Sequence, residues 1–496
     1  MDWSPPASSS RESDDRIALA LVLLSSALHL AYAGLVPLTP QEAYYWQYAR
    51  HPALSYFDHP PAAAWTIRAL TLLLGESERV VRLAAVSWSA VFCLFFYLSG
   101  RRLLAGRGAL AALAVMLVTP FFSLGQTIIT PDGPLVAGWI AAFYFTVRAL
   151  QDDRPAWLLA AGLATGVASL GKYTGFLLLP QILAALLLDR RGRRMLAGPW
   201  PWVGAALSLL VFSPVVIWNA THGWASFGFQ FGKRGAEMQL EPVLVGRFLG
   251  LQALVVSPLL FLVLLASMGV AAARWREERM RLFALFSVPM MALWTVVSPF
   301  HWVKMNWAVP VYPTALLAAV AIYQSRPERW RGLAVATVSL AAFSALYLTL
   351  MPLAPWLPFP ARDDTMAGWR ALAERVEVER RRGGGEPLPV VGCFYRTAST
   401  LAWNLPGKPE TWSSNAFGEP GLAYDFWRDP RELTGREVLL VLDDRDAGWC
   451  LSRKERCDPL EALEPLEVRR GSGRVTTFRF WRCRYQGPPA AAARGR

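Results

Sequence analysis

The chain has 496 residues, of which 54% are hydrophobic, and its mean hydropathy is +0.29. These values exclude an ordinary soluble protein of two or three domains and indicate a protein that crosses a membrane several times. The formal net charge of +13 is typical of some nucleic-acid binders. Here the arginines concentrate in short loops between apolar segments, where membrane topology and anionic lipid headgroups explain them. We therefore exclude a nucleic-acid partner and expect membrane lipids instead.

The apolar segments predict an α-helical polytopic membrane protein with about eleven spans. A spanning helix needs about 20 predominantly apolar residues, because its backbone groups must find hydrogen bonds within the helix while it crosses the hydrocarbon. The candidate segments lie at residues 17–36, 81–99, 109–125, 134–150, 157–171, 173–188, 200–218, 248–272, 282–298, 305–323 and 332–351.

The first segment admits two interpretations. Ala31-Tyr32-Ala33 follows an apolar run and resembles a signal-peptidase site. Glu12, Asp14 and Asp15 precede that run and are unusual in a signal peptide, so we favour an uncleaved helix. Cleavage would leave the topology of the later segments unchanged.

Basic residues are distributed unevenly between the predicted loops. With the N-terminus in the cytoplasm, the inner loops hold 17 basic residues in about 59 positions, and the outer loops hold 8 in about 88. The positive-inside rule therefore fixes the orientation. It predicts a multi-pass protein of a bacterial inner membrane, with everything after about residue 352 in the periplasm.

A proline-rich hinge at 352–360 separates a membrane domain at 1–351 from a charged segment at 361–485. We expect this segment to be a small α/β domain, because it shows helical and strand-like periodicity. Residues 486–496 are rich in alanine without hydrophobic periodicity and are expected to be a disordered tail. The periodic stretches of the C-terminal domain lie at residues 363–380, 389–395, 437–443 and 475–481.

Four of the five cysteines lie in the C-terminal domain, at positions 393, 450, 457 and 483. An oxidising periplasm would allow them to form disulfides. From the short spacing we expect a bridge between Cys450 and Cys457.

The first outer loop carries two acids and a histidine among aromatic residues. It contains Gln41 and Glu42, then Tyr45, and later Tyr56 and the pair Asp58-His59. An amphipathic segment at headgroup depth would explain the aromatics alone. Acids close to a membrane boundary are costly unless they are paired or functional, so a catalytic role is the competing explanation.

A second outer turn places Asp132 at the start of a predicted span. Its simplest explanation is an acid at a helix N-terminus. Three of the five lysines of the chain, Lys172, Lys233 and Lys304, also fall at outer helix ends or loops. A compact ammonium suits contact with a phosphate group, although so few lysines can also gather by chance. Arg234 and His301 lie beside aromatics in the same outer segments.

Three motifs together resemble the protein-mannosyltransferase superfamily, which includes the aminoarabinose transferases of lipid A. They are Glu42-Ala43-Tyr44-Tyr45-Trp46, Tyr56-Phe57-Asp58-His59-Pro60-Pro61 and Thr130-Pro131-Asp132. The resemblance implies the GT-C fold, an outward catalytic cavity and a dolichyl- or undecaprenyl-phosphate sugar as donor. It covers nearly the whole membrane domain, and the second half matches only loosely.

The resemblance also implies roles for individual residues. Family members usually carry Asp-Glu where this chain has Gln41-Glu42, so we expect Glu42 to be the general base and hold Asp132 in reserve. Asp58-His59-Pro60 resembles the Glu-Lys-Pro of aminoarabinose transferases. There the basic residue meets the lipid phosphate and the acid can hold a metal. His59 would act as that cation only when protonated.

The resulting hypothesis is a glycosyltransferase that moves a sugar from a polyprenyl-phosphate carrier to lipid A, a glycolipid, a wall polymer or a protein. We expect Asp58 to orient His59 or hold a divalent cation, with no cofactor required. The donor phosphate would meet His59, Lys172, Lys233, Arg234 and Lys304, and the sugar or acceptor would meet Gln41, Tyr45, Tyr56 and His301.

Two other functions compete with this hypothesis. A lipid or sugar transporter or flippase would also be polytopic, but it would carry charges at the membrane midplane and repeated broken helices. A binding or scaffold subunit that has lost activity would explain Gln41 in place of an aspartate.

Overall fold

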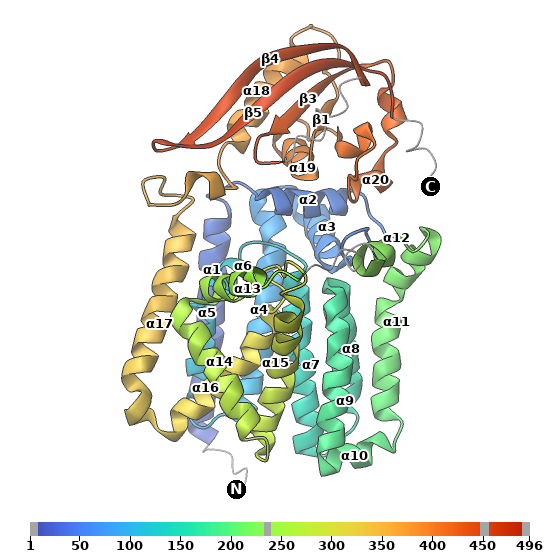
Figure 1. Cartoon of the computed structure of the whole chain (residues 1–496). Coiled ribbons are helices and arrows are strands. Elements are labelled where there is room, and N and C mark those ends of the chain that lie inside the picture. The colour runs from blue at the N-terminus through green and yellow to red at the C-terminus, as the bar shows by residue number, and fades with distance from the viewer. Residues whose placement is uncertain (1–7, 233–239, 447–455, 489–496) are drawn as a thin grey trace.

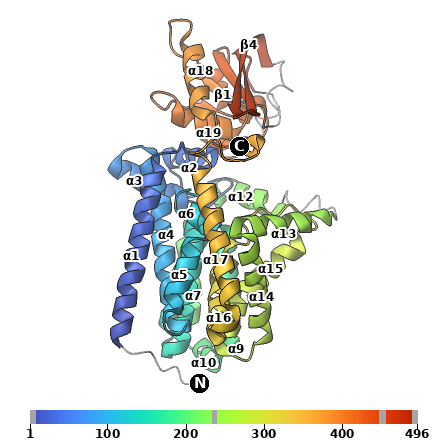
Figure 2. The ribbon, with the colours of Figure 1, turned by 90° about the vertical axis from the view of Figure 1, so that its left-hand side faces the viewer.

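The computed structural model describes residues 8–232, 240–446 and 456–488. A bundle of long helices forms the membrane domain, and a smaller domain with a sheet covers one end of it (Figure 1). We call this covered end the upper end of the bundle. The N-terminal end of the chain lies at the opposite, lower end, and the turned view in Figure 2 shows the same arrangement.

The helices of the bundle follow one another in chain order. The longer ones are α1 (Ser8–Ala33), α3 (Ala62–Leu74), α4 (Glu78–Leu103), α5 (Gly108–Leu117), α7 (Asp132–Asp152), α8 (Trp157–Gly171), α9 (Leu178–Leu188), α11 (Trp200–Thr221), α13 (Val243–Val256), α14 (Pro258–Ala273), α15 (Glu278–Val297), α16 (Tyr312–Ser325) and α17 (Pro327–Leu350). The connecting ones are α2 (Pro40–Arg50), α6 (Pro120–Gly125), η1 (Tyr173–Leu177), α10 (Arg190–Leu196), α12 (Ala225–Phe227), η2 (Gly228–Gly232) and η3 (Val309–Val311).

Several of these helices match membrane spans in length and composition. Among the described residues six are long and apolar enough, and the number rises to eight if each of two sharply bent helix pairs is one span. Shorter apolar helices, including α3, α5 and α8, stand beside them. The mostly helical, multi-pass class is confirmed, whereas the number eleven stays a prediction.

Two predicted spans are interrupted. The segment predicted at 248–272 consists of α13 and α14, which meet at an angle of 109°. Pro258 begins α14 and Ser257 before it has a φ of 89°. Proline has no N–H to continue a helix, so the chain turns there. The segment predicted at 109–125 is likewise divided into α5 and α6, with Pro120 beginning α6.

Helix α2 lies across the upper end of the bundle, between the long helices and the C-terminal domain (Figure 1). Its start is well defined by sequence. The Thr39 hydroxyl accepts from the Glu42 N–H, and the Glu42 carboxylate accepts from the Thr39 N–H, which is a capping box, and Pro40 follows the cap. The consequence is a rigid platform of aromatic side chains below the C-terminal domain.

The C-terminal domain contains a five-stranded sheet with the order β2-β1-β3-β5-β4. The central strand β3 pairs in parallel with β1 and antiparallel with β5. Its elements are η4 (Ala361–Asp363), α18 (Trp369–Arg381), β1 (Val390–Gly392), α19 (Tyr395–Asn404), β2 (Thr411–Trp412), η5 (Ser414–Phe417), α20 (Tyr424–Trp427), η6 (Pro430–Leu433), β3 (Glu437–Asp443), β4 (Cys457–Arg470) and β5 (Gly473–Tyr485). The small α/β domain expected from the sequence is present.

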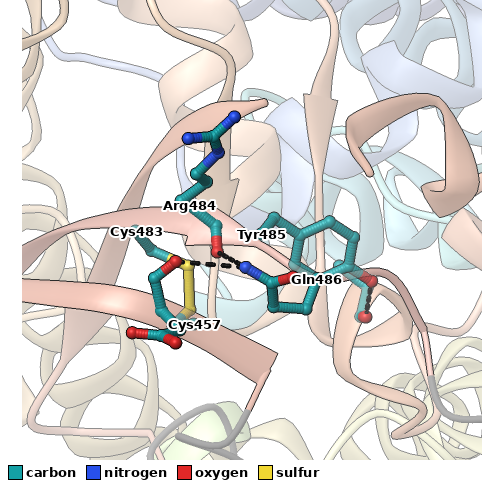
Figure 3. The surroundings of a disulfide bond; sticks show 7 residues. Cys457, Cys483, Arg484, Tyr485 and Gln486 are labelled. Carbon is teal, nitrogen blue, oxygen red and sulfur yellow. Dashed lines mark hydrogen bonds between the residues drawn. A yellow bond between two sulfur atoms is a disulfide. The ribbon is translucent and has the colours of Figure 1, made fainter. Parts of the chain in front are cut away.

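A disulfide joins β4 to β5. Cys457 is bonded to Cys483, next to the buried Tyr485 (Figure 3). The predicted bridge between Cys450 and Cys457 is therefore wrong, and Cys450 lies outside the described residues. Spacing along the chain favoured the near cysteine, whereas the antiparallel pairing of β4 with β5 brings the distant one to Cys457. Cys393 is disulfide-bonded as well. Residues 489–496 of the expected tail also lie outside the described residues.

The two domains share one hydrophobic core. The rings of Trp46 in α2 and Trp403 in α19 meet edge to face with centroids 4.9 Å apart. Lys408 lies over the Trp403 ring and forms an ion pair of 3.0 Å with Glu76. Because this core crosses the domain boundary, α2 fixes how the C-terminal domain sits on the bundle. The buried aromatics of the shared core are Tyr44, Tyr45, Trp46, Tyr48, Tyr56, Trp403 and Tyr424.

Candidate active site

Segments that are far apart in the sequence meet at the upper end of the bundle, beneath the C-terminal domain. Hydrogen bonds join α2 to the following loop at 51–61, the start of α7 to the residue after α8, and α7 to the loop after α15. The predicted carboxylates Glu42, Asp58 and Asp132 all lie in these segments, but their surroundings differ.

The carboxylate of Glu42 is fully engaged in structural contacts. Arg82 in α4 donates to both of its oxygens at 2.9 Å, and both side chains are 0% exposed. The same guanidinium donates to the backbone carbonyls of Ala33, Val36 and Pro37. Glu42 thus ties α2 to α4 and to the end of α1, and its geometry is that of a buried ion pair rather than of a free base.

Asp58 is buried, and its two tyrosine donors reach the same oxygen. Tyr44 donates to Oδ1 at 3.0 Å, and Tyr48 donates to Oδ1 as well. His59 Nε2 lies 4.0 Å from Oδ2. Gln230 in η2 donates to the Asp58 backbone carbonyl at 2.8 Å, which holds the loop in place.

The electrostatic surroundings of Asp58 favour a base. Burial raises the pKa of its carboxyl above the ordinary value, and this effect exceeds the opposing hydrogen bonds from Tyr48 and Tyr44 and the positive charge of Lys304. A raised pKa brings a carboxylate closer to the range in which it takes up a proton at neutral pH.

Asp132 forms the first residue of α7 and is 3% exposed. Its Oδ1 pairs with Lys172 Nζ at 2.5 Å, and its Oδ2 accepts from the Asn306 amide at 2.7 Å. The Thr130 hydroxyl lies 3.3 Å from the same Oδ2. Asp132 therefore joins α7, α8 and the loop after α15 at one point, and it is more fully neutralised than Asp58.

Gly171 explains how Lys172 reaches Asp132. A Cβ atom at position 171 would lie 2.6 Å from the Leu135 nitrogen and 2.9 Å from the Pro131 carbonyl oxygen. Only glycine allows the end of α8 to approach the start of α7 this closely.

Gly171→Ala is therefore expected to push α8 away from α7 and to separate Lys172 from Asp132. Overpacking of this kind costs about 1–3 kcal/mol, which a lower midpoint of thermal unfolding in detergent would report. Gly250→Ala is the matched control, because nothing lies within 4 Å of a Cβ at this position in α13. Equal midpoints for the two variants would contradict the close-packing explanation.

The rings of Tyr45 and His59 meet edge to face with centroids 5.8 Å apart. Burial raises the pKa of the Tyr45 hydroxyl strongly, and the negative charges of Asp58 and Asp132 raise it further. Lys304 is exposed, and its positive charge acts on Asp58.

The other predicted sugar or acceptor contacts divide between the site and its surroundings. Tyr56 is 2% exposed, and its hydroxyl donates to the Tyr48 carbonyl, so it supports α2 from within the core. Gln41 accepts a hydrogen bond from Tyr395 of the C-terminal domain at 3.3 Å. His301 is partly exposed, with its ring beside that of Trp307.

Two predicted cations cannot be placed. Lys233 and Arg234 lie outside the described residues. In the part of the chain that the structure describes, no group of three or more His, Cys, Asp or Glu side chains is arranged to hold a metal ion. A cation at Asp58 therefore stays a prediction without a full ligand set.

Comparisons with known proteins agree with this architecture. Residues 58–218 match the family model of dolichyl-phosphate-mannose-protein mannosyltransferases. The lipid A galacturonosyltransferase RgtD of Rhizobium johnstonii is 25% identical over 67% of this chain and 70% of its own length. An undecaprenyl phosphate-alpha-4-amino-4-deoxy-L-arabinose arabinosyl transferase of Yersinia enterocolitica is 26% identical over 48% of this chain, which is 45% of its own length.

The crystal structure of apo ArnT from Cupriavidus metallidurans covers 95% of this chain and 98% of its own with a TM-score of 0.66 at 14% identity. The chain resembles the GT-C glycosyltransferases in sequence and in fold. At that identity the ArnT likeness shows the fold alone, including the C-terminal domain. The residues matched by the family model include Asp58, His59, Asp132 and Lys172.

Sequence reasoning missed several residues of this GT-C site. Tyr44 and Tyr48, which hold Asp58, and Asn306, which holds Asp132, were not assigned roles. The contribution of the C-terminal domain was missed as well, where the Ala423 N–H donates to the Tyr44 hydroxyl at 3.0 Å. The YxxxY spacing on α2 was an available signal, because residues four apart lie on one face of a helix.

A small pocket of about 40 Å³ adjoins the site. It lies between α4, α5, α6 and the start of α7, and Thr130, Asp132 and Gly133 are among its lining residues. Most of its other walls are hydrophobic, including Trp88 and Phe92.

Proposed function

We propose that this enzyme transfers a sugar from an undecaprenyl-phosphate carrier to a lipid acceptor of the lipid A type, on the periplasmic side of a bacterial inner membrane. The observation that carries the proposal is the placement of two acids and two lysines at the upper end of the bundle. Asp58 and Asp132 act on the same tyrosine, Lys172 pairs with Asp132, and the charge of Lys304 acts on Asp58.

The transfer forms one bond and breaks one bond at the anomeric carbon. An oxygen of the acceptor attacks this carbon while its bond to the carrier phosphate breaks, through a transition state of oxocarbenium character. The acceptor proton moves to a base, and the carrier leaves as polyprenyl phosphate. The site must therefore supply one proton acceptor and positive charge near the leaving phosphate.

Asp58 is our proposed base, in place of Glu42. Both oxygens of Glu42 are occupied by Arg82, and both oxygens of Asp132 are occupied by Lys172 and Asn306. Both tyrosine donors of Asp58 reach Oδ1, so we assign Oδ2 to the acceptor proton, and the raised pKa of this carboxyl suits the task. Asp132 is assigned to positioning Lys172.

Lys304 and His59 are proposed to bind the leaving phosphate. Lys304 is exposed, and its positive charge acts on Asp58, which supports a role close to the reacting atoms. His59 is partly buried beside Asp58, with Nε2 4.0 Å from Oδ2, and it would bind the phosphate in its protonated form. Lys172 would contribute long-range positive charge, because its ammonium is already paired with Asp132.

A lipid acceptor agrees with the comparisons. One relative is named as a lipid A galacturonosyltransferase and another as an undecaprenyl phosphate-alpha-4-amino-4-deoxy-L-arabinose arabinosyl transferase. A second structure of ArnT, with a TM-score of 0.60, contains undecaprenyl phosphate.

The direct test is a transfer assay with the purified full chain. Undecaprenyl-phosphate sugars and lipid A are supplied in detergent, and mass spectrometry follows both substrates. We expect lipid A to gain the mass of one sugar while undecaprenyl phosphate appears in equal amount. No transfer from any polyprenyl-phosphate sugar, or transfer from a nucleotide sugar instead, would refute the proposed donor.

The proposed orientation predicts two different compartments for the two ends of the bundle. Helix α10 lies at the lower end and the C-terminal domain at the upper end (Figure 1). Reporter enzymes fused after Arg194 and after Trp356 should therefore differ, with the first active in the cytoplasm and the second in the periplasm. The same compartment for both fusions would contradict the orientation.

A further inference from the structure

We propose that the C-terminal domain completes the active site, because its Ala423 N–H orients the Tyr44 hydroxyl that holds Asp58. Tyr44 and the Ala423 amide are thus positioning groups for the reaction. The inference rests on the proposed role of Asp58 as base. It gives the C-terminal domain a function in catalysis itself, beyond packing against the bundle.

The hydrogen bonds around Tyr44 have only one consistent direction. The Ala423 N–H lies 3.0 Å from the Tyr44 oxygen, and that oxygen lies 3.0 Å from Asp58 Oδ1. A backbone amide can only donate, whereas a phenol has one proton and can also accept. The Tyr44 oxygen therefore accepts from Ala423, and its single proton is directed to the Asp58 carboxylate.

The segment that presents the Ala423 amide is held firmly. Leu422 before it has a φ of 56°, a left-handed conformation that the surrounding contacts must stabilise. The Asp425 carboxylate accepts from the Gly421 N–H at 3.0 Å, and the Asn415 amide donates to the Tyr424 carbonyl at 2.9 Å. The amide is consequently fixed over Tyr44 by the fold of the C-terminal domain.

This segment packs against the aromatic face of helix α2. The Tyr44 ring lies 6.0 Å from that of Trp427, and His51 stacks on Trp427 with centroids 4.6 Å apart. The Tyr424 hydroxyl bonds to Ser399 and lies within 3.4 Å of the Gln47 amide. Tyr44 is 0% exposed, so water does not replace the Ala423 donor.

Burial disfavours the charged form of Asp58, and the two hydroxyl donors at Oδ1 partly offset this effect. Removing either donor should raise the pKa of this carboxyl, and the base would then be lost to protonation at a higher pH. Several other groups bear on the same carboxylate, and none of them contacts the Ala423 amide. They are Tyr45 and Tyr48 of α2, His59 of the same loop, Tyr173 after α8, Lys304 after α15 and Tyr395 of α19.

The experiment compares pH profiles of turnover for Tyr44→Phe, Ala423→Pro and the double variant. Proline removes the amide proton, and the φ of −64° at Ala423 suits it. In both single variants the acidic limb of the profile should move to higher pH. Turnover should be lost at a proton concentration on the order of tenfold lower, because hydrogen bonds to a charged group are strong. In the Tyr44→Phe background, Ala423→Pro should cause no further shift.

Two controls distinguish an effect on the position of the Tyr44 hydroxyl from a general loosening of the C-terminal domain on the bundle. Tyr48→Phe removes the other donor to Oδ1, and Ala423→Pro should still move the acidic limb in that background, because the Ala423 N–H acts on the carboxylate through Tyr44. Glu410→Gln removes the ion pair between Glu410 and Arg50 at the same domain boundary. The acidic limb of Glu410→Gln should lie at the same pH as that of the unchanged protein, because Glu410 has no contact with Tyr44 among the described residues.

The outcomes distinguish this inference from the proposed function. If the unchanged protein transfers sugar but the limb does not move in Tyr44→Phe, the inference is wrong. It is also wrong if Ala423→Pro shifts the limb equally with and without Tyr44. If no sugar is transferred at all, the proposed function fails, and labelling of Asp58 by a hydrophobic carbodiimide across pH still reports its ionisation. An unchanged labelling profile in Tyr44→Phe would then overturn the inference.

Discussion

Replacing Asp58 by asparagine is expected to lower the turnover number of sugar transfer by about 10²- to 10⁴-fold, the usual contribution of a general base. The amide retains the shape of the side chain and still accepts hydrogen bonds from Tyr44 and Tyr48 at Oδ1. It cannot take up the acceptor proton. The loss should therefore appear in turnover, while the affinity for the polyprenyl-phosphate donor stays close to that of the unchanged protein.

A matched variant and a rival variant decide the interpretation. Asp444→Asn neutralises an acid in an exposed ion pair with Arg479 and should leave turnover intact. Full activity of Asp58→Asn together with loss of turnover in Asp132→Asn would move the base to Asp132. Full activity of both would mean that the acceptor needs no base, as for an acceptor group that is already an anionic phosphate.

The unchanged enzyme should also lose activity as the pH falls through the pKa of Asp58. This pKa is raised in the folded protein, so protonation of the base begins at a higher pH than for an exposed aspartate. The activity is complete well above that pKa and is lost below it. In Asp58→Asn this acidic limb should be absent from the remaining activity.

Glu42→Gln is expected to destabilise the protein by about 3–5 kcal/mol, because it leaves the buried charge of Arg82 without its partner. Arg82 and Glu42 are both 0% exposed, and each oxygen of the carboxylate accepts from the guanidinium. Thermal and denaturant unfolding in detergent would measure the change. Any loss of transfer should follow the loss of folded protein rather than a change in turnover per folded molecule.

Glu432→Gln is the control for this destabilisation. Glu432 pairs with Arg428 in the C-terminal domain, and both side chains are about 40% exposed. Exposed pairs of this kind contribute about 0–1 kcal/mol, so the midpoint of unfolding should hardly change. A fully stable Glu42→Gln protein without turnover would instead restore Glu42 as the base.

The architecture was largely predictable because its signals are local. Apolar length and the arginine-rich loops indicate a polytopic protein, and strand-like periodicity after the proline hinge indicates the small C-terminal domain. The break between α13 and α14 was overlooked, although Pro258 lies inside the predicted span. Hydropathy averages over such a residue, whereas the backbone cannot continue through it without losing a hydrogen bond.

The roles of the acids were harder to predict, because they depend on partners elsewhere in the chain. Glu42 is the type of residue that can act as a base. Its carboxylate is bound by Arg82, which lies 40 positions later in the chain, and this ion pair has a structural role. Lys172 was expected to meet a phosphate, which stays a prediction, and its pairing with Asp132 was not foreseen. A single sequence shows which residues are charged, while the pairing of those charges is set by tertiary packing.

The shared core has a consequence for how this protein is made. Tyr395 meets Gln41 across 354 positions of sequence, and Ala423 meets Tyr44 across 379. At synthesis rates of about 5–20 residues per second, α2 exists for roughly 20–70 s before its partners leave the ribosome. During that interval the part of its aromatic face that meets the C-terminal domain is uncovered. On the proposed function, the catalytic centre is complete only after the C-terminal domain has packed onto the bundle.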